Sequence, residues 1–349
     1  MDKQGSPEKP QLTQYFDFQR LPTAWGGAVG KALFRCQPED FQVDEVFGPD
    51  EVGNDLGFDF SGEGEHLVLH IRKRDQNTQW VAGLLAKLAG VKRNDVSFCG
   101  LKDRFAVTTQ WFSVYLPGRE VTLEQLQHDD LEILSCGRHN RKLRRGMHRG
   151  NQFRIVLRDF QASRDDVEGR LRTIAEKGVP NYFGEQRFGH NGGNLLEAQK
   201  LVQQNRLKGD RKNSGKNRKG SALYLSAARS WLFNLVLAQR IKDKSWQQPL
   251  AGEDIVTGPL WGRGRNPVSA EAAAFEADIL CDWQSWCHAL EHAGLNQERR
   301  ELTLVPRRLN WFWAGESQLV LEFYLPTGCF ATVILRELTQ LSRPSFQGL

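Results

Sequence analysis

The sequence lacks the usual signs of secretion, membrane insertion and disulfide bonding. Its six cysteines are scattered, with no Cys-x-x-Cys pair and no tight spacing to histidine, so we expect buried free thiols. No apolar run approaches the roughly 18 residues of a membrane-spanning helix. The first 25 residues are polar and contain no apolar signal core. We therefore expect a cytoplasmic protein with no membrane partner.

Positive charge is absent from one stretch of the chain and concentrated in two others. The net charge of +5 is too small by itself to indicate a nucleic-acid partner. Residues 36–65 carry ten acids and no Lys or Arg, so this stretch should repel phosphate. Residues 138–149 carry six cations and no acid, and residues 206–219 carry seven cations against Asp210. Each run alone is more often a solvated loop, but together they favour a polyanionic partner.

Hydrophobic periodicity separates a strand-rich part of the chain from a helix-rich part. Strands are predicted at residues 65–72, 96–99, 106–116 and 153–157. Helices are predicted between Asn77 and Gly90, at 165–177 and at 330–338. After Gly178 the sequence becomes helix-rich, and strand patterns return only at residue 302. The pattern predicts a second domain inserted into the first.

We predict the domain boundaries from these changes. Residues 1–29 show no alternating or repeating pattern and are predicted to be a flexible leader. Residues 30–177 together with 305–349 are predicted to form one domain, and residues 178–304 the inserted one.

Two short motifs offer competing chemistry. His288-Ala-Leu-Glu-His292 matches the His-x-x-Glu-His pattern of inverted zinc proteases, with two imidazoles one helical turn apart. Its flanking tryptophans indicate an ordinary amphipathic helix, so a zinc protease is kept only as a minor alternative and no metal ligand is assigned. The segment from Gly209 to Asn217 lacks the spacing and the Ser or Thr of a phosphate loop, which excludes an NTPase.

A third motif, Gly100-Leu-Lys-Asp-Arg-Phe-Ala-Val-Thr-Thr-Gln110, places Asp103 between two cations on a predicted connection between strands. Alone it would indicate a surface ion pair. It resembles, however, the Gly-x-Lys-Asp-x-x-Ala-Val-Thr-x-Gln signature of the TruD family of tRNA pseudouridine synthases. Four further segments resemble the family in the same order, at residues 38–45, 149–153, 179–189 and 330–337.

The resemblance implies an isomerase that converts uridine 13 of tRNA to pseudouridine without a cofactor. It implies an α+β fold, in which a catalytic domain has a mixed, largely antiparallel sheet with flanking helices. The inserted segment would be an α/β TRUD domain. The implied partner is tRNA; no protein partner is implied, and we expect a monomer.

The resemblance also implies roles for single residues. Asp103 matches the catalytic aspartate, and the substrate-contacting positions are matched by Phe41, Asn151 and Phe330. Phe153 matches a position where an aromatic ring packs against the target base. Arg35 stands where we expect Lys in the family, so the charge is kept while the geometry changes.

The chemistry explains why such residues would be needed. Pseudouridine forms when the bond from uracil N1 to ribose C1′ breaks, the base rotates, and C5 bonds to C1′. A carboxylate serves as the nucleophile only while ionised, and the candidate cations for holding Asp103 ionised are Arg35, Lys102, Arg104 and Arg336. Attack at uracil C6 and attack at C1′ would use the same carboxylate, so both stay open.

The target base must also leave its stack, at a cost of a few kcal/mol, and stacking on aromatic rings contributes about 1–3 kcal/mol per base. Without the family resemblance, Phe41 and Phe153 would be interpreted as core residues. A non-catalytic RNA-binding protein, in which Asp103 is only an ion-pair partner, remains the main alternative.

Overall fold

The computed structural model describes residues 16–47, 62–203 and 215–344, with only the backbone of residues 215–221. The chain divides into two compact units. The sheet unit contains Ala28–Lys177, Val305–Ala331 and the chain from Leu338 onward. The helical unit contains the chain up to Gly27 together with Gly178–Leu304 and Thr332–Glu337.

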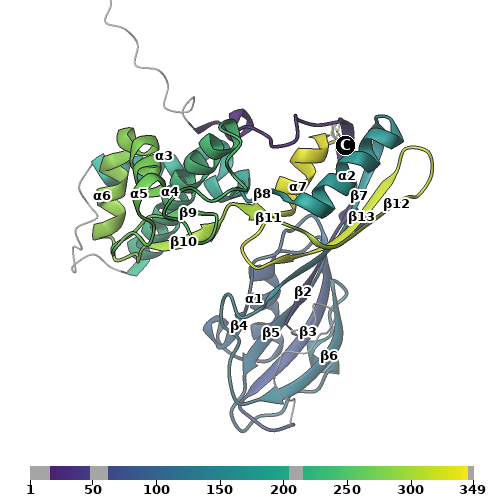
Figure 1. Ribbon diagram of the computed structural model, residues 1–349. Coiled ribbons are helices and arrows are strands. Elements are labelled where there is room, and N and C mark those ends of the chain that lie inside the picture. The colour runs from purple at the N-terminus through teal and green to yellow at the C-terminus, as the bar shows by residue number, and fades with distance from the viewer. Residues whose placement is uncertain (1–15, 48–61, 204–214, 345–349) are drawn as a thin grey trace, which may run out of the picture. The chain divides into compact units, whose positions relative to one another are not determined.

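A ten-stranded sheet forms the centre of the sheet unit (Figure 1). The strands follow the order β12 (Arg307–Trp313), β13 (Leu319–Pro326), β7 (Gly150–Gln161), β2 (Phe41–Val46), β5 (Val107–Tyr115), β3 (His66–Arg74) and β6 (Leu131–His139). Outside this path, β1 (Gly30–Phe34) pairs with β7 and β14 (Thr339–Ser342), and β4 (Val96–Phe98) pairs with β5. The pairs β1–β14 and β2–β5 are parallel and the others are antiparallel. The predicted mixed, largely antiparallel sheet is therefore confirmed.

Helix α1 (Thr78–Leu88) covers part of this sheet beside β4 (Figure 1). Asn77 begins the helix as predicted, because its side chain accepts a hydrogen bond from the backbone N–H of Gln79. Val81 and Leu85 are completely buried and pack into a core made with the apolar faces of β3 and β5. The second predicted helix is α2 (Arg164–Lys177), which likewise buries one apolar stripe.

The described part of the helical unit contains four longer helices and two short strand pairs. Its helices are α3 (Gly193–Gln203), α4 (Gly215–Lys242), α5 (Ala270–Ile279) and α6 (Gln284–His292). Its strand pairs are β8 (Val179–Pro180) with β11 (Thr303–Leu304) and β9 (Thr257–Leu260) with β10 (Glu298–Glu301). Helix α7 (Ala331–Leu338) contributes Thr332–Glu337 to this unit. Among the described residues, no helix is both long and apolar enough to cross a membrane.

The flexible leader predicted for residues 1–29 is wrong for the part that the structure describes. Phe16, Phe18 and Leu21 are buried, and the ring of Phe16 meets Trp231 edge-on with their centroids 5.8 Å apart. The guanidinium of Arg336 donates to the backbone carbonyl of Leu21. Single aromatic side chains pack this segment against the rest of the helical unit. They follow no helix or strand period, so a periodicity analysis does not detect them. Residues 1–15 lie outside the described residues.

Candidate active site

Asp103 lies on the connection between β4 and β5, as predicted. Its side chain is 36% exposed, and its Oδ2 accepts a hydrogen bond of 2.6 Å from Nη2 of Arg35, whose side chain is 12% exposed. Arg35 directly follows β1 and has a φ of 58°. A non-glycine residue in this left-handed region carries strain, which is commonly found at functional positions. The turn at Arg35 brings a nearly buried cation to a half-exposed carboxylate.

Aromatic rings fix the direction of the Arg35 guanidinium. Its central carbon lies 4.0 Å from the ring centroid of Phe41 and 5.1 Å from that of Phe34. The two rings meet edge-on, with centroids 5.6 Å apart. A planar guanidinium stacks on a ring face more favourably than a lysine ammonium. Phe41 is buried, so its observed role is to support Arg35.

Phe153 continues this aromatic cluster toward the core. Its ring stacks on Phe323 with centroids 5.4 Å apart and lies 6.0 Å from Phe41. Phe153 is only 6% exposed, so most of its ring surface is already covered by protein. Phe330 is half-buried and directly precedes α7. The roles of both residues toward a flipped base stay predictions.

Lys102 joins two other buried groups. Its Nζ lies 2.9 Å from Oε1 of Glu45 and donates to Oδ1 of Asn151 over 2.7 Å. The exposed side-chain fractions are 7% for Lys102 and 0% for Glu45. Glu45 on β2 is the register partner of Asn151 on β7, and it also accepts from the backbone N–H of Trp111 over 3.2 Å. This ion pair fixes the residue directly before Asp103.

Side chains from α1 and β5 fix the same loop through its backbone. The N–H of Lys102 donates to Oγ1 of Thr78 over 3.0 Å, and this hydroxyl donates to Oε1 of Gln110. Nε2 of Gln110 in turn donates to the carbonyl of Gly100 over 3.3 Å. A Cβ at Gly100 would lie 3.0 Å from Oε1 of Glu45, which explains the glycine. The catalytic candidate therefore lies on a preorganised loop.

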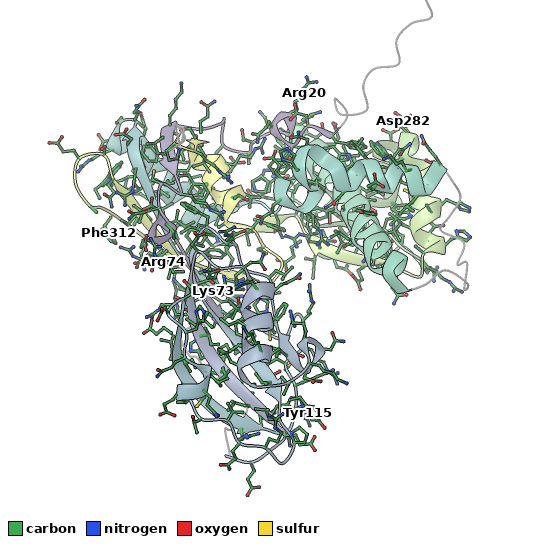
Figure 2. The ribbon with its side chains drawn as sticks, turned by 180° about the vertical axis from the view of Figure 1, so that it is seen from behind. Arg20, Lys73, Arg74, Tyr115, Asp282 and Phe312 are labelled. Carbon is green, nitrogen blue, oxygen red and sulfur yellow. The ribbon has the colours of Figure 1, made fainter. Side chains whose placement is uncertain are left out.

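Lys73 belongs to the site but was missed in the sequence. It is 1% exposed, and its Nζ donates to the carbonyls of Gln76 and Asp103 over 2.5 and 3.3 Å. Figure 2 shows it beside Arg74. Tyr115 of β5, also labelled there, pairs with His66 at the other end of β3. Lys73 lies on the same inward face of β3 as residues 67, 69 and 71. A lysine on this otherwise apolar face is the feature of the sequence that could have identified it as a site residue.

Burial lowers the pKa of Lys73 to about 8, although the charge of Asp103 opposes this shift. The unfolded chain keeps the ordinary value near 10.5. Between these values the unfolded state binds more protons, so Lys73 makes the free energy of unfolding rise with pH over this window. We expect Lys73→Met to remove that rise. The measurement is urea unfolding of both proteins from about pH 7.5 to about pH 10.5.

Arg74→Met provides the matched control, since Arg74 is exposed and pairs with Glu39. Its difference from the wild type should stay constant over the same pH range, because arginine remains protonated. A constant difference for Lys73→Met as well would contradict the lowered pKa of Lys73.

The four candidate cations have different partners. Arg35 contacts the carboxylate of Asp103, and Lys102 contacts Glu45. The Nε of Arg104 lies 3.5 Å from Asp75 on the exposed surface. Arg336 donates to backbone carbonyls in the helical unit. Arg35 is therefore the cation that the structure assigns to Asp103.

The alternative zinc motif forms a compact cluster on α6. The potential ligand atoms of His288, Glu291 and His292 lie within 4.8 Å of one another. Glu291 accepts a hydrogen bond of 2.9 Å from Nε1 of Trp261. This cluster supplies three zinc ligands only if Glu291 is one of them. Glu291 would then not be available as the general base that an inverted zinc protease requires. The arrangement does not favour protease chemistry.

The first basic run begins at the end of β6 and continues through the loop to β7. Arg138 donates to the carbonyls of Leu116 and Arg119, whereas the other five cations of the run are exposed. The second run, residues 206–219, lies entirely outside the described residues or in the segment described by its backbone alone.

Comparisons with known proteins agree with the motif. The family model described as tRNA pseudouridine synthase D (TruD) matches residues 23–213. A tRNA pseudouridine synthase D from Cellvibrio japonicus is 46% identical over 329 residues, covering 92% of this chain and 93% of the relative. The protein of that name from Pseudomonas aeruginosa is 42% identical over 348 residues, covering 92% and 94%. A solved structure titled a putative tRNA pseudouridine synthase D (TruD), from Methanosarcina mazei, superposes with a TM-score of 0.66 at 20% identity, covering 91% of this chain and 95% of that one. That likeness shows a shared fold.

Proposed function

The chain belongs to the tRNA pseudouridine synthase D (TruD) family, and we propose that it isomerises uridine 13 of tRNA to pseudouridine with Asp103 as its nucleophile. The observation that carries the proposal is the contact between Asp103 and Arg35. It places an ion-paired, half-exposed carboxylate on the loop that carries the family motif. An ionised carboxylate at an accessible position is what nucleophilic attack requires.

The proposed reaction uses the two carboxylate oxygens of Asp103 differently. Arg35 holds Oδ2, so we assign attack to Oδ1, at either C6 of uracil or C1′ of the ribose. The glycosidic bond from N1 breaks, the base rotates, and C5 bonds to C1′. The proton then leaves C5, N1 takes up a proton, and the bond to Oδ1 breaks, which releases the carboxylate of Asp103. No atom is oxidised, and we propose that no cofactor takes part.

The surrounding residues would position the target nucleotide. Asn151 offers its amide near the loop while Lys102 holds its Oδ1, and Phe330 is proposed as a wall for the extruded base. Phe41 would act mainly by supporting Arg35, and Phe153 by packing against Phe41, because both are buried. Lys102 would act by fixing the loop.

We further propose that residues 30–177 and 305–349 form the catalytic domain and that 178–304 form a TRUD domain. The support is the division of the chain near Gly178 and Leu304, from which only Thr332–Glu337 depart by grouping with the helical unit. We propose that the protein acts as a monomer in the cytoplasm, where tRNA is modified.

Purified protein incubated with unmodified tRNA tests the function directly. Mass-spectrometric mapping should find pseudouridine at position 13, with no dependence on added metal or chelator. Binding without product would indicate the non-catalytic RNA-binding alternative. Stoichiometric zinc together with chelator-sensitive peptide hydrolysis would indicate the protease.

A further inference from the structure

A cavity of about 570 Å³ opens beside β4 in the sheet unit. The short 3-10 helix Arg93–Asp95, β4 and the loop of the first basic run form its walls. Four cations line it: Arg93, Lys142, Arg144 and Arg145. None of the described residues that line it is acidic. The sequence placed three of these cations in one run, but it did not indicate that Arg93 joins them.

The four cations keep their charge available to a ligand. None of the salt bridges formed by the described residues involves them. Asp95, the acid nearest to Arg93 in sequence, accepts instead from the backbone N–H of Lys92. Because like charges repel, their convergence is favourable when an anion binds between them.

Phe98 positions two of the arginines without neutralising them. The central guanidinium carbons of Arg93 and Arg145 lie 5.7 and 5.6 Å from its ring centroid. Phe98 is 8% exposed, so its ring is a fixed support between two segments that are distant in sequence. Arg93 is held further by a hydrogen bond of 3.1 Å to the carbonyl of Val96. The ring of Phe98 and this hydrogen bond thus give the exposed side chains of Arg93 and Arg145 defined positions at the pocket wall.

The pocket wall is continuous with the loop that carries Asp103. Phe98 ends β4, and Cys99 and Gly100 lead from it into the catalytic motif. The backbone N–H of Gly146, next to Arg145, donates to the carbonyl of Cys99 over 3.0 Å. A ligand held by the basic loop would thus lie against the strand end from which the catalytic loop departs.

We propose that this pocket, the β4 pocket, binds the phosphodiester backbone of the RNA substrate close to the nucleotide presented to Asp103. The inference rests on the proposed function. Phosphate contacts fix the position and register of a nucleic acid without reading its sequence. The pocket is largely open to solvent, and its volume of about 570 Å³ is enough for a phosphate and its sugar. Inorganic phosphate shares this chemistry and is a separate arm of the test.

The test compares Arg93→Gln and Arg145→Gln with Arg141→Gln. Arg141 belongs to the same basic run and is exposed, but it does not line the pocket, so it is a control of equal charge change. We expect each pocket variant to weaken tRNA binding about fivefold near 0.1 M salt and to reduce the salt slope by about 0.9. Arg141→Gln should stay within about twofold of wild type.

The loss should appear in the KM for tRNA more than in the turnover at saturating tRNA, because a backbone contact away from the reacting atoms stabilises the bound substrate and the transition state alike. Circular dichroism melting checks that each variant is folded. If Arg93→Gln does not fold, Arg145→Gln, which changes an exposed residue, still tests the pocket. If Arg141→Gln lost as much tRNA affinity as the pocket variants, the proposal would be overturned. The affinity would then depend on the total charge of the basic run and not on the pocket.

Isothermal titration with inorganic phosphate supplies the second arm. Variants that lose phosphate binding but bind tRNA like the wild type would show a site for a small anion only, which overturns the RNA proposal. A wild-type protein that forms no pseudouridine, while its pocket variants lose tRNA affinity, would count against the proposed function alone.

Discussion

Replacing Asp103 by Asn is expected to abolish pseudouridine formation while tRNA affinity stays within a few fold. The amide has nearly the shape of the carboxylate, and its oxygen can still accept from Arg35. It is not a nucleophile, and losing a nucleophile commonly lowers turnover by several orders of magnitude. Because the Asp103 side chain is 36% exposed, the exchange should leave the melting temperature nearly unchanged.

Single-turnover assays on unmodified tRNA, filter binding and thermal melting measure these three quantities. Asp75→Asn is the matched control, since Asp75 is a neighbouring carboxylate whose partner is Arg104. Asn tolerates the φ of 49° at that position, so the control should keep its turnover within about twofold. Substantial turnover in Asp103→Asn, or its loss of folding, would remove Asp103 from the nucleophile's role.

Local patterns in the sequence predicted the elements that support the site. The cap at Asn77, the buried stripe of α1 and the existence of strand β3 depend on neighbouring residues, and the structure confirms them. The alternation predicted for β3 is wrong, because residues 67–71 are all buried. The connection that carries Asp103 was predicted for the same reason, because the strands on either side are visible in the sequence.

The contacts of Asp103 could not be predicted in this way. Its partner Arg35 lies 68 positions away and is aimed by a left-handed backbone conformation and by the ring of Phe41. Residues that are distant in sequence form this contact only in the folded chain. The hydrophobic periodicity of a segment reports on neighbouring residues and does not predict it. The resemblance to the family supplied Arg35 as a candidate but did not choose it over the other cations.

Charge counting was wrong for part of the acidic stretch. Residues 36–65 were expected to form a surface that repels phosphate, but Asp40 and Glu45 are both 0% exposed. Asp40 binds Arg158, and Glu45 binds Lys102. Asp40 directly precedes β2 and Glu45 lies within it. Alternate side chains of a strand point to the same face whatever their charge, so an acid can point into the core. Residues 48–61, which hold four more of these acids, lie outside the described residues.

Lys102→Met is expected to lower the free energy of unfolding by about 3–5 kcal/mol, because it leaves the fully buried Glu45 without its counter-charge. The double variant Glu45→Gln with Lys102→Met should recover most of this loss, since a neutral amide oxygen can still accept from the N–H of Trp111. Its turnover should stay below that of the wild type, because Asn151 loses the contact that orients it. Urea unfolding of the wild type and both variants, with pseudouridine assays on the folded proteins, measures these effects.

Arg154→Met is the control for removing a cation from an ion pair on the same sheet. Arg154 and Glu322 form an ion pair in which both side chains are 40% exposed, so its loss should cost no more than about 1 kcal/mol. If the double variant proved as unstable as Lys102→Met, the loss would come from packing around the lysine stem rather than from an unpaired charge. If Lys102→Met were as stable as the wild type, Glu45 would not depend on Lys102, and the contacts of Thr78 and Gln110 would be sufficient to hold the loop before Asp103.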